Sequence, residues 1–159
     1  MVIKLDMSKV FDRLEWSFLI KVFRYFGFSD DFCDLIFQCI STTSLSVILN
    51  GSPCEDFSLI RGIIQGDPLS PYIFILAIEY LSRQLTNAQQ DKSIKGIKVD
   101  ALSPAINHLL FADDCLIFTQ ANLSSENNLL EFLHNFSSQS GQVINFEKSS
   151  IYFSKKTKP

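Results

Sequence analysis

The sequence has few of the features that mark secreted, membrane-spanning or zinc-binding proteins. It contains four cysteines, none in a CxxC or Cys/His spacing, so we expect buried free thiols rather than a disulfide framework or a zinc site. The longest apolar stretch, residues 72–81, is interrupted by Glu79 and is too short to span a bilayer. The opening MVIKLD lacks the charged and apolar regions of a signal peptide. These absences predict an intracellular protein, in the nucleus or the cytoplasm.

Positive charge is also scarce. The chain carries 14 Lys and Arg against 17 Asp and Glu, for a net charge of −3. This balance argues against a self-sufficient nucleic-acid binder, which normally presents a basic face. The length of 159 residues, with 47% hydrophobic residues and fifteen Phe, instead predicts one domain, or a large piece of one, with an aromatic-rich core.

Periodicity and turn residues predict a mixed α+β chain, with helices packed on one face of an antiparallel sheet. Strands are expected at 2–6, 44–49, 54–59, 143–146 and 150–153, with weak ones at 94–99 and a hairpin at 107–119. Helices are expected at 15–26, at 29–40 with Ser29 as cap, at 68–85, and from a Ser124 cap to Gly141. Asn50-Gly51 is typical of a hairpin turn, and residues 61–67 form a glycine-containing loop.

The most informative stretch is the hairpin HLLFADDCLIFT, which carries Asp113 and Asp114 at its tip. Apolar runs on both sides predict strands buried on at least one face. Two like charges beside a core repel each other, and a divalent cation held between them would relieve that repulsion. An ordinary polar turn is the alternative interpretation.

Asp6 ends the first predicted strand and has a role only if that strand lies beside the hairpin. Asp6 and Asp113 would then meet, and three carboxylates could hold two divalent ions. The alternative is that Asp6 simply ends a strand. A third element is the loop RGIIQGDPLSP, in which two glycines allow close backbone approach and Gln65 offers both donor and acceptor groups. Its end, Asp67-Pro68, is explained as a helix start.

These segments occur in an order that resembles a known family. KLDMSKVFD, RGIIQGDPLSPYIFILAIEYLSR, HLLFADDCLIF and GQVINFEKSSIYFS are similar to palm motifs A, B, C and D of reverse transcriptases, with matching spacing. The similarity is greatest to the non-LTR (LINE-type) retrotransposon enzymes, especially those of plants. It covers about residues 4–153, which is nearly the whole chain.

The resemblance implies a polymerase palm with a ferredoxin-like sheet and RNA-directed DNA polymerase activity. Asp6 matches the motif A aspartate, and Asp113 and Asp114 match the motif C pair. Together they would hold Mg²⁺, with Mn²⁺ as a substitute, and Asp113 would be the firmer ligand of its pair. The implied partners are an RNA template, a DNA primer and deoxynucleoside triphosphates, and no membrane is implied.

The resemblance also assigns residues around the nucleotide. Phe11 matches the aromatic residue that leaves no room for a ribose 2′-hydroxyl, with a core role as the alternative. Gln65 and Gly66 match the loop that touches the nucleotide and the template, and Arg61 is near enough to reach a phosphate. Lys148 matches a lysine near the triphosphate that could protonate the leaving pyrophosphate, with a solvated turn lysine as the alternative.

Departures from the family pattern are mild within the motifs and large outside them. Phe111 stands where many relatives have Tyr, and Val10 where many have Ala. Segments resembling the fingers, the thumb and an endonuclease are absent from the 159 residues. The chain alone should therefore be weak or inactive in processive synthesis. A catalytically silent palm-like remnant that binds metal, nucleotide or a partner is the main alternative, and a nucleotide cyclase on a related sheet is a weaker one.

Other catalytic schemes find little support in the sequence. His108 and His134 are lone histidines, expected on a strand and on a helix, and we interpret both as structural. The sequence contains no GxSxG motif, and none of its serines lies in a recognisable nucleophile context. Asp12, which is also typical of the family's motif A, is interpreted as structural.

Overall fold

The structure is a computed structural model that describes residues 1–154, and it divides into two compact units. The first unit contains residues 1–10 and the chain from residue 78 onward, and the second contains residues 11–77. The longest helix, α3 (Ser70–Gln90), contributes its first turns to the second unit and its remainder to the first. Within residues 1–154, no helix is long and apolar enough to cross a membrane.

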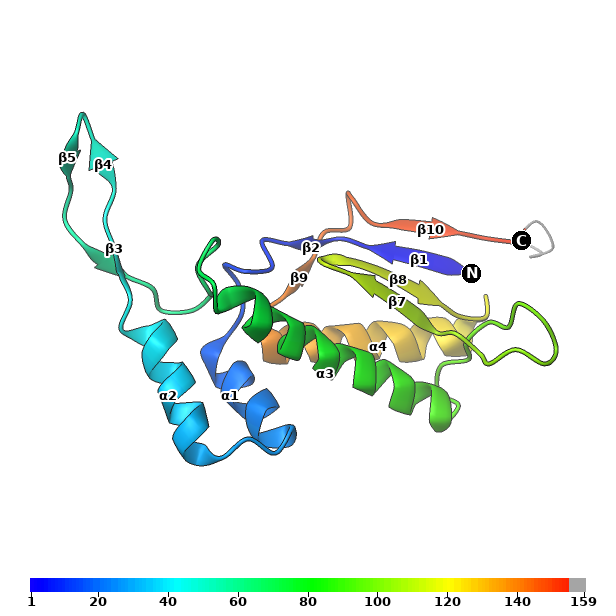
Figure 1. Cartoon of the computed structure of the whole chain (residues 1–159). Helices are drawn as coiled ribbons and strands as arrows, with labels where there is room; N and C mark the ends of the chain where they lie inside the picture. The colour runs from blue at the N-terminus through cyan, green and yellow to red at the C-terminus, as the bar shows by residue number, and fades with distance from the viewer. Residues whose placement is uncertain (155–159) are drawn as a thin grey trace. The chain divides into compact units, whose positions relative to one another are not determined.

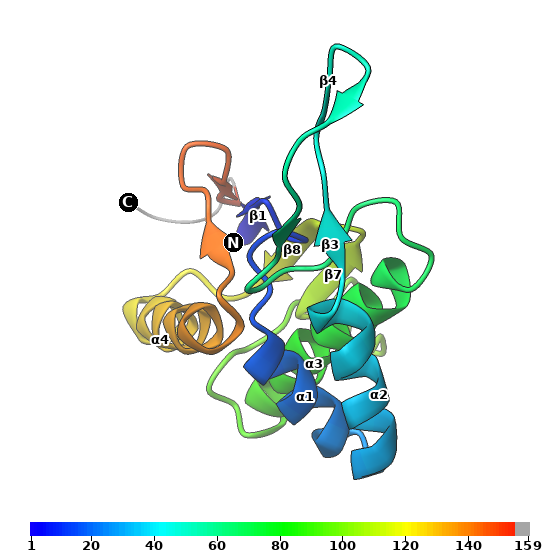
Figure 2. The ribbon, with the colours of Figure 1, turned by 90° about the vertical axis from the view of Figure 1, so that its left-hand side faces the viewer.

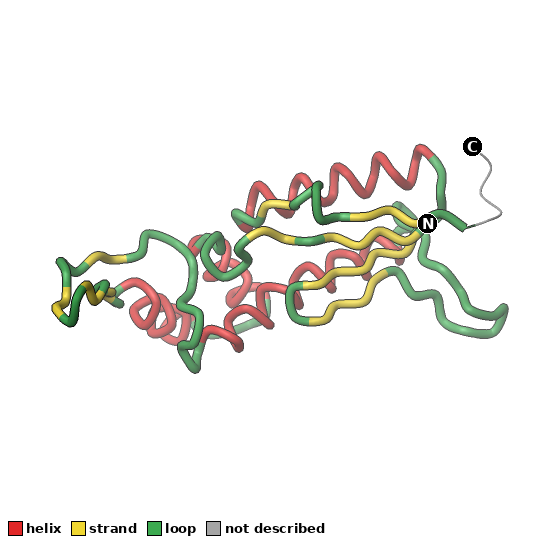
Figure 3. The backbone as a smooth tube through the Cα atoms, turned by 90° about the horizontal axis from the view of Figure 1, so that it is seen from above, coloured by secondary structure: helices red, strands yellow, loops and turns green. Residues whose placement is uncertain are grey.

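The first unit is built on a four-stranded antiparallel sheet in the order β10-β1-β8-β7. Its elements are β1 (Val2–Leu5), β2 (Met7–Ser8), β7 (His108–Phe111), β8 (Asp114–Phe118), α4 (Leu123–Ser140), β9 (Val143–Ile144) and β10 (Ser150–Tyr152). The short strands β2 and β9 pair separately. Helix α4 and the later part of α3 lie on one side of the sheet (Figure 1). Seen from the other side, the four strands are not crossed by a helix (Figure 3). The predicted α+β architecture is confirmed.

Alternation along the two central strands decides which face of the sheet is buried. Ile3 and Leu5 of β1 lie on the same face as Cys115 and Ile117 of β8, and all four are buried. The residues between them are only partly covered, as expected for a sheet with one face against a core. The helical residues that complete this unit's core are Leu81, Leu85, Leu129, Leu133 and Phe136.

His108 belongs to a polar network on the helix-covered side of the sheet. Asn107 Nδ2 donates to the carbonyl of Leu85, so Asn107 Oδ1 is left to accept from His108 Nδ1 at 2.7 Å. The neutral imidazole therefore carries its proton on Nδ1, and Nε2 accepts from the Ser82 hydroxyl at 2.8 Å. This arrangement supports the structural role predicted for His108. Burial lowers the pKa of His108, although the charge of Glu79 opposes the shift.

This shift predicts a pH-dependent loss of stability. Because the folded state resists protonation of His108, the unfolded state binds more protons once the pH falls below the ordinary histidine pKa of about 6.5. The contribution of neutral His108 to the free energy of unfolding is complete above that pH. The free energy of unfolding should therefore decrease when the pH is lowered from 7.5 to 5.5. Urea denaturation at the two pH values measures this decrease. In the His108→Gln variant the free energy of unfolding should decrease less over the same pH range. An equal decrease in both proteins would contradict the prediction.

The second unit is built on two packed helices, α1 (Trp16–Tyr25) and α2 (Asp30–Ser41). Ser29 caps α2 by accepting from the Phe32 amide, and Gly27 ends α1 with a positive φ of 86°, as both were predicted to do. Apolar residues at helical spacing face each other across the pair. The buried ones are Phe18, Leu19, Val22, Phe23, Cys33, Ile36 and Ile40.

A hairpin follows α2 and extends away from that helix (Figure 2). Its turn is Asn50-Gly51, and both residues have positive φ, as predicted from the dipeptide. The two continuous strands predicted on either side are wrong. The hairpin is divided into β3 (Ser44–Leu45), β4 (Ile48–Leu49), β5 (Ser52–Pro53) and β6 (Phe57–Ser58). Between the paired segments, residues 46–47 face residues 54–56, and this extra residue interrupts the ladder as a bulge does.

Four further predictions need correction. Helix α4 is capped by Asn122, whose side chain accepts from the Ser125 amide, rather than by Ser124. The strands expected at 94–99 reduce to a single bridge between Ile97 and Ile106. Cys33 and Cys115 are buried as expected, but Cys39 and Cys54 are exposed. Helix α3 also begins two residues later and ends five residues later than the predicted 68–85.

Candidate active site

The hairpin of β7 and β8 carries the paired carboxylates, as the sequence predicted. Phe111 pairs with Asp114, so the connecting turn consists of Ala112 and Asp113. Ala112 has a φ of +49°, the left-handed region that L-residues other than Asn and Asp seldom adopt. Asp113 therefore lies within a strained two-residue turn, and Asp114 is the first residue of β8.

The strain at Ala112 can be tested by substitution. Ala112→Gly should raise the free energy of unfolding by up to about 1 kcal/mol, because glycine adopts positive φ without a steric penalty. Ala88→Gly, within α3, is the comparison variant and should lower it by about 1–2 kcal/mol, since glycine there loses both helix propensity and a buried methyl group. Urea denaturation measures both variants. A change in the free energy of unfolding with the same sign in both variants would contradict the positive φ of Ala112.

Strand β1 brings Asp6 to the same end of the sheet. Leu5 pairs with Cys115, so Asp6 immediately follows the last paired residue of β1, and Asp114 immediately precedes its partner. The condition set for a role of Asp6, that its strand lie beside the hairpin, is met. The backbone of Asp6 is also fixed from the other side. Its amide donates to Ser149 Oγ at 3.1 Å, and its carbonyl accepts from the Asn145 amide at 2.8 Å.

A lysine that the sequence interpretation missed lies among these carboxylates. Lys4 Nζ is 3.1 Å from Asp114 Oδ1, and both side chains are about half exposed. The hydrogen bond and the charge of Asp114, with a smaller contribution from Asp6, raise the pKa of Lys4 against partial desolvation. Because strand residues two apart share a face, the KLD spacing of Lys4 and Asp6 could have indicated this contact.

The donor set suits a hard divalent cation, but the arrangement is not a closed site. Carboxylate oxygens are the ligands that Mg²⁺ prefers in proteins. Yet no three His, Cys, Asp or Glu side chains within residues 1–154 are grouped so that they could hold a metal ion. In this arrangement the Lys4 ammonium supplies the positive charge beside Asp114. The assignment of Asp6, Asp113 and Asp114 as ligands therefore remains a prediction.

Lys148 lies in the turn between β9 and β10, in the first unit. Its amide lies 3.3 Å from both the carbonyl and the Oδ1 of Asn145, and its side chain is exposed. Asn145 is the same residue whose amide holds the carbonyl of Asp6. One turn thus fixes the backbones of Lys148 and Asp6, although the position of the Lys148 ammonium is left free by these contacts.

The glycine-containing loop lies in the second unit and forms an exposed turn. Gln65 and Gly66 occupy the turn, and both are exposed. Asp67 Oδ1 accepts from the Leu69 amide at 2.7 Å and so prepares the start of α3. Arg61 Nη1 lies 3.4 Å from Glu15 Oε1, so the guanidinium predicted to reach a phosphate pairs here with a carboxylate.

Phe11 is half-buried in the second unit. Its ring stacks on that of Phe74 in α3, with centroids 4.9 Å apart and an angle of 23° between the ring planes. Phe74 itself is buried. The ring of Phe11 therefore has packing on one side and remains partly accessible, an arrangement that is compatible with either role considered for it.

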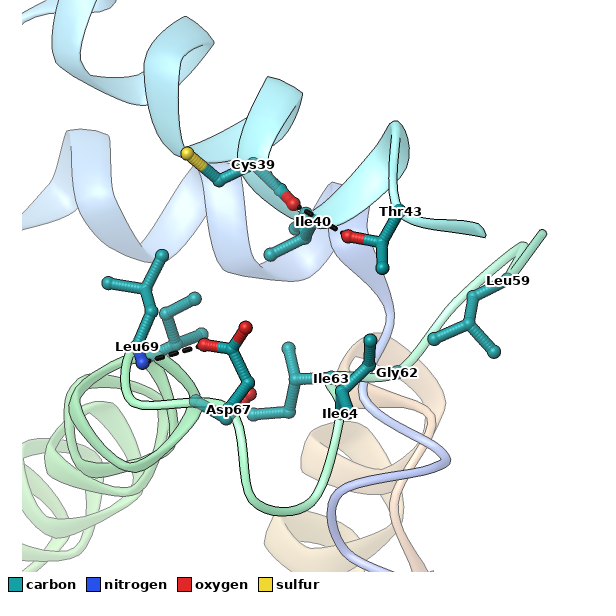
Figure 4. Close-up of a pocket in the computed structure, with 11 residues that line it drawn as sticks. Cys39, Ile40, Thr43, Leu59, Gly62, Ile63, Ile64, Asp67 and Leu69 are labelled. Carbon is teal, nitrogen blue, oxygen red and sulfur yellow. Dashed lines mark hydrogen bonds between the residues drawn. The ribbon is translucent and has the colours of Figure 1, made fainter. Parts of the chain in front are cut away.

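A cavity of about 200 Å³ lies between the end of α2 and the loop (Figure 4). Its wall is mainly aliphatic, and the carboxylate of Asp67 within it is engaged with the Leu69 amide. Neither Gln65 nor Gly66 contributes to it, and an aliphatic wall does not suit a triphosphate. The lining residues are Cys39, Ile40, Thr43, Leu59, Gly62, Ile63, Ile64, Asp67, Leu69, Ser70 and Ile73.

Comparison with known proteins agrees with the motif order. Residues 1–158 match the family described as "Reverse transcriptase (RNA-dependent DNA polymerase)". The chain belongs to the reverse transcriptase family. This reverse transcriptase sequence is 31% identical over 147 residues to the Pol polyprotein of the retrotransposable element R2DM of Drosophila melanogaster, covering 92% of the chain and 13% of that protein. It is 42% identical over 109 residues to an uncharacterised mitochondrial protein of Arabidopsis thaliana, covering 69% of the chain and 88% of that protein.

Solved structures of telomerases show the same fold at low sequence identity. Telomerase of Candida albicans, solved with a fragment of telomeric RNA, superposes with a TM-score of 0.72 at 15% identity, over 99% of the chain and 28% of the telomerase. Apo telomerase of Candida tropicalis superposes with a TM-score of 0.68 at 18% identity, over 94% of the chain and 30% of the telomerase. The chain thus spans under a third of these telomerases and of the R2 polyproteins. Its family and fold agree with the resemblance seen in the motifs.

Proposed function

We propose that this chain is the palm of an RNA-directed DNA polymerase that transfers a deoxynucleotide to a primer 3′-hydroxyl. The observation that carries the proposal is the pairing of β1 with β8, which aligns Asp6 with the Asp113–Asp114 hairpin in a chain of this family. Both compact units would form parts of this one palm. The implied partners are an RNA template, a DNA primer and deoxynucleoside triphosphates, and the telomerase solved with RNA supports a nucleic-acid template.

Asp6, Asp113 and Asp114 would hold Mg²⁺, or Mn²⁺ in its place. When bound, such ions activate the attacking oxygen and neutralise charge on the phosphates. In the transfer, the primer 3′-hydroxyl would lose its proton to solvent water, its oxygen would form a bond to the α-phosphorus, and the bond from that phosphorus to pyrophosphate would break. Lys148 would give a proton to that leaving group. The whole reaction needs a grip on the duplex that lies outside these residues, so little processive synthesis is expected.

The other residues would position the nucleotide. The ring of Phe11 would exclude a ribose 2′-hydroxyl, and the exposed turn of Gln65 and Gly66 would contact the base pair being formed. Arg61 would exchange its pairing with Glu15 for a phosphate, which costs little because exposed ion pairs contribute under about 1 kcal/mol. These assignments follow the motif positions and are supported by the exposure of the turn.

A second candidate function is a palm-like remnant that binds metal, nucleotide or a partner without turnover. The observation that favours it is the ion pair of Lys4 with Asp114, in which an ammonium group neutralises one of the carboxylates that catalysis would need for a metal ion. The two candidates differ in chemistry rather than in fold. A remnant would bind Mn²⁺ or a deoxynucleotide yet add none to a primer.

The test uses excess chain with a DNA primer on an RNA template, one deoxynucleoside triphosphate and Mn²⁺. We expect Mn²⁺ binding, measured by the loss of its free electron paramagnetic resonance signal, and slow addition of a single nucleotide. Binding without addition would support the remnant instead. Absence of Mn²⁺ binding would contradict the metal assignment, and robust processive extension would contradict the expected weakness of the isolated chain.

A further inference from the structure

Gly62 lies unusually close to the backbone that carries Phe11. A Cβ atom added at Gly62 would lie 2.6 Å from the Asp12 carbonyl oxygen and 2.9 Å from the Phe11 carbonyl oxygen. Gly62 also has a φ of +80°, which L-residues rarely adopt. The neighbouring atoms belong to the backbone, so no side-chain rotation could make room. Only glycine fits here without moving residues 11 and 12.

Hydrogen bonds fasten the two segments at the same place. The amide of Ile63 donates to the carbonyl of Phe11 at 2.9 Å, and the amide of Gly62 donates to the carbonyl of Leu14 at 2.8 Å. The indole Nε1 of Trp16 donates to the carbonyl of Gly62 at 2.6 Å. Both polar backbone groups of Gly62 are therefore used, and Ile63 is buried. The attachment is rigid, since three hydrogen bonds and a close backbone contact restrain it.

We propose that Gly62 is a positioning residue that sets where the ring of Phe11 stands relative to the Gln65–Gly66 turn, and thereby governs discrimination between deoxynucleotides and ribonucleotides. The backbone of Phe11 is held by Gly62 and Ile63, and its ring is held by Phe74. The turn that would contact the nucleotide begins only three residues after Gly62. This inference rests on the proposed function, because it assumes that Phe11 faces the sugar.

The experiment compares Gly62→Ala with Gly27→Ala in the full chain. Gly27 has a similar φ of +86°, but a Cβ there meets nothing within 4 Å, so this control matches the backbone strain without the contact. NMR titrations in Mg²⁺ give the ratio of the GTP to the dGTP dissociation constants. We expect Gly62→Ala to lower this ratio about tenfold, since small misplacements of positioning groups have large effects. Gly27→Ala should keep it within about twofold.

Amide hydrogen exchange of Ile63 provides a readout that needs no nucleotide. Protection should be lost in Gly62→Ala and retained in Gly27→Ala. If the wild-type chain prefers dGTP and Gly62→Ala has the same ratio of GTP to dGTP dissociation constants, the inference is overturned and the proposed function is left intact. Wild-type chain without preference overturns the proposed role of Phe11 and this inference with it, whereas retained Ile63 protection in Gly62→Ala overturns the inference alone.

A second variant covers the case in which Gly62→Ala does not fold. Trp16→Phe removes the indole donor to the Gly62 carbonyl and one of the two fused rings, but keeps an aromatic ring that can still meet Phe37 edge to face. Trp16→Phe should reduce the protection of the Ile63 amide and the ratio of the GTP to the dGTP dissociation constants. Both reductions should be smaller than those expected for Gly62→Ala. A wild-type ratio in Trp16→Phe, combined with wild-type protection of Ile63, would overturn the proposal.

Discussion

Replacing Asp6 and Asp113 together by asparagine is expected to lower the affinity for Mn²⁺ by about three orders of magnitude. A unit charge and a divalent ion 4 Å apart attract by about 2 kcal/mol even at the dielectric constant of water, which is about thirtyfold in affinity per carboxylate. The two losses are expected to add because Asp6 directly follows β1 and Asp113 directly precedes β8, at the same end of the sheet. Electron paramagnetic resonance of free Mn²⁺ measures the affinity.

Two further variants make this expectation specific. Asp56→Asn removes an exposed carboxylate of the hairpin that follows α2 and should leave the affinity within about twofold. Lys4→Met removes the ammonium that pairs with Asp114 and should raise the affinity severalfold, because the metal ion then no longer competes with that positive charge. Equal affinities in the wild type and the double variant would show that these carboxylates do not bind the ion.

Truncation of Ile117 to alanine is expected to lower the free energy of unfolding by about 2–5 kcal/mol. Ile117 is fully buried on the central strand β8, on the face that α3 and α4 cover. The lost contacts and the remaining cavity both contribute, since the neighbouring strands β1 and β7 hold their register by backbone hydrogen bonds and cannot close the gap. Urea denaturation followed by circular dichroism measures the loss.

Leu109 provides the matched control for this substitution. It lies on β7, on the opposite face of the same sheet, and is 54% exposed. Leu109→Ala should change the free energy of unfolding by about 0.5 kcal/mol or less, because little apolar surface is returned to water. Comparable losses in the two variants would mean that both faces of the sheet are buried in solution.

Local signals in the sequence were sufficient for much of the fold. The Asp-Asp hairpin and the end of α1 at Gly27 depend on periodicity and turn chemistry within a few residues, and both were predicted. The cap of α4 was misplaced because Asn122 and Ser124 are both good capping residues two positions apart. The bulge near Cys54 arises from one extra residue, which a propensity pattern does not reveal.

The arrangement of the candidate site depended on long-range placement. That Lys4 reaches Asp114 follows from the register of β1 against β8, and this register is fixed by the whole sheet. The need for glycine at position 62 likewise arises from a segment some 50 residues earlier in the chain. Residue types could thus be assigned to motifs from the sequence, whereas their contacts could not.

Trp16 has a practical consequence for studying this protein. It is the only tryptophan in the chain, and its indole N–H is bound to the carbonyl of Gly62. Indole emission is sensitive to the polarity and hydrogen bonding around that N–H. The chain therefore contains an intrinsic optical reporter next to the loop of Gln65 and Gly66, which allows movements of that loop to be followed in solution without a label.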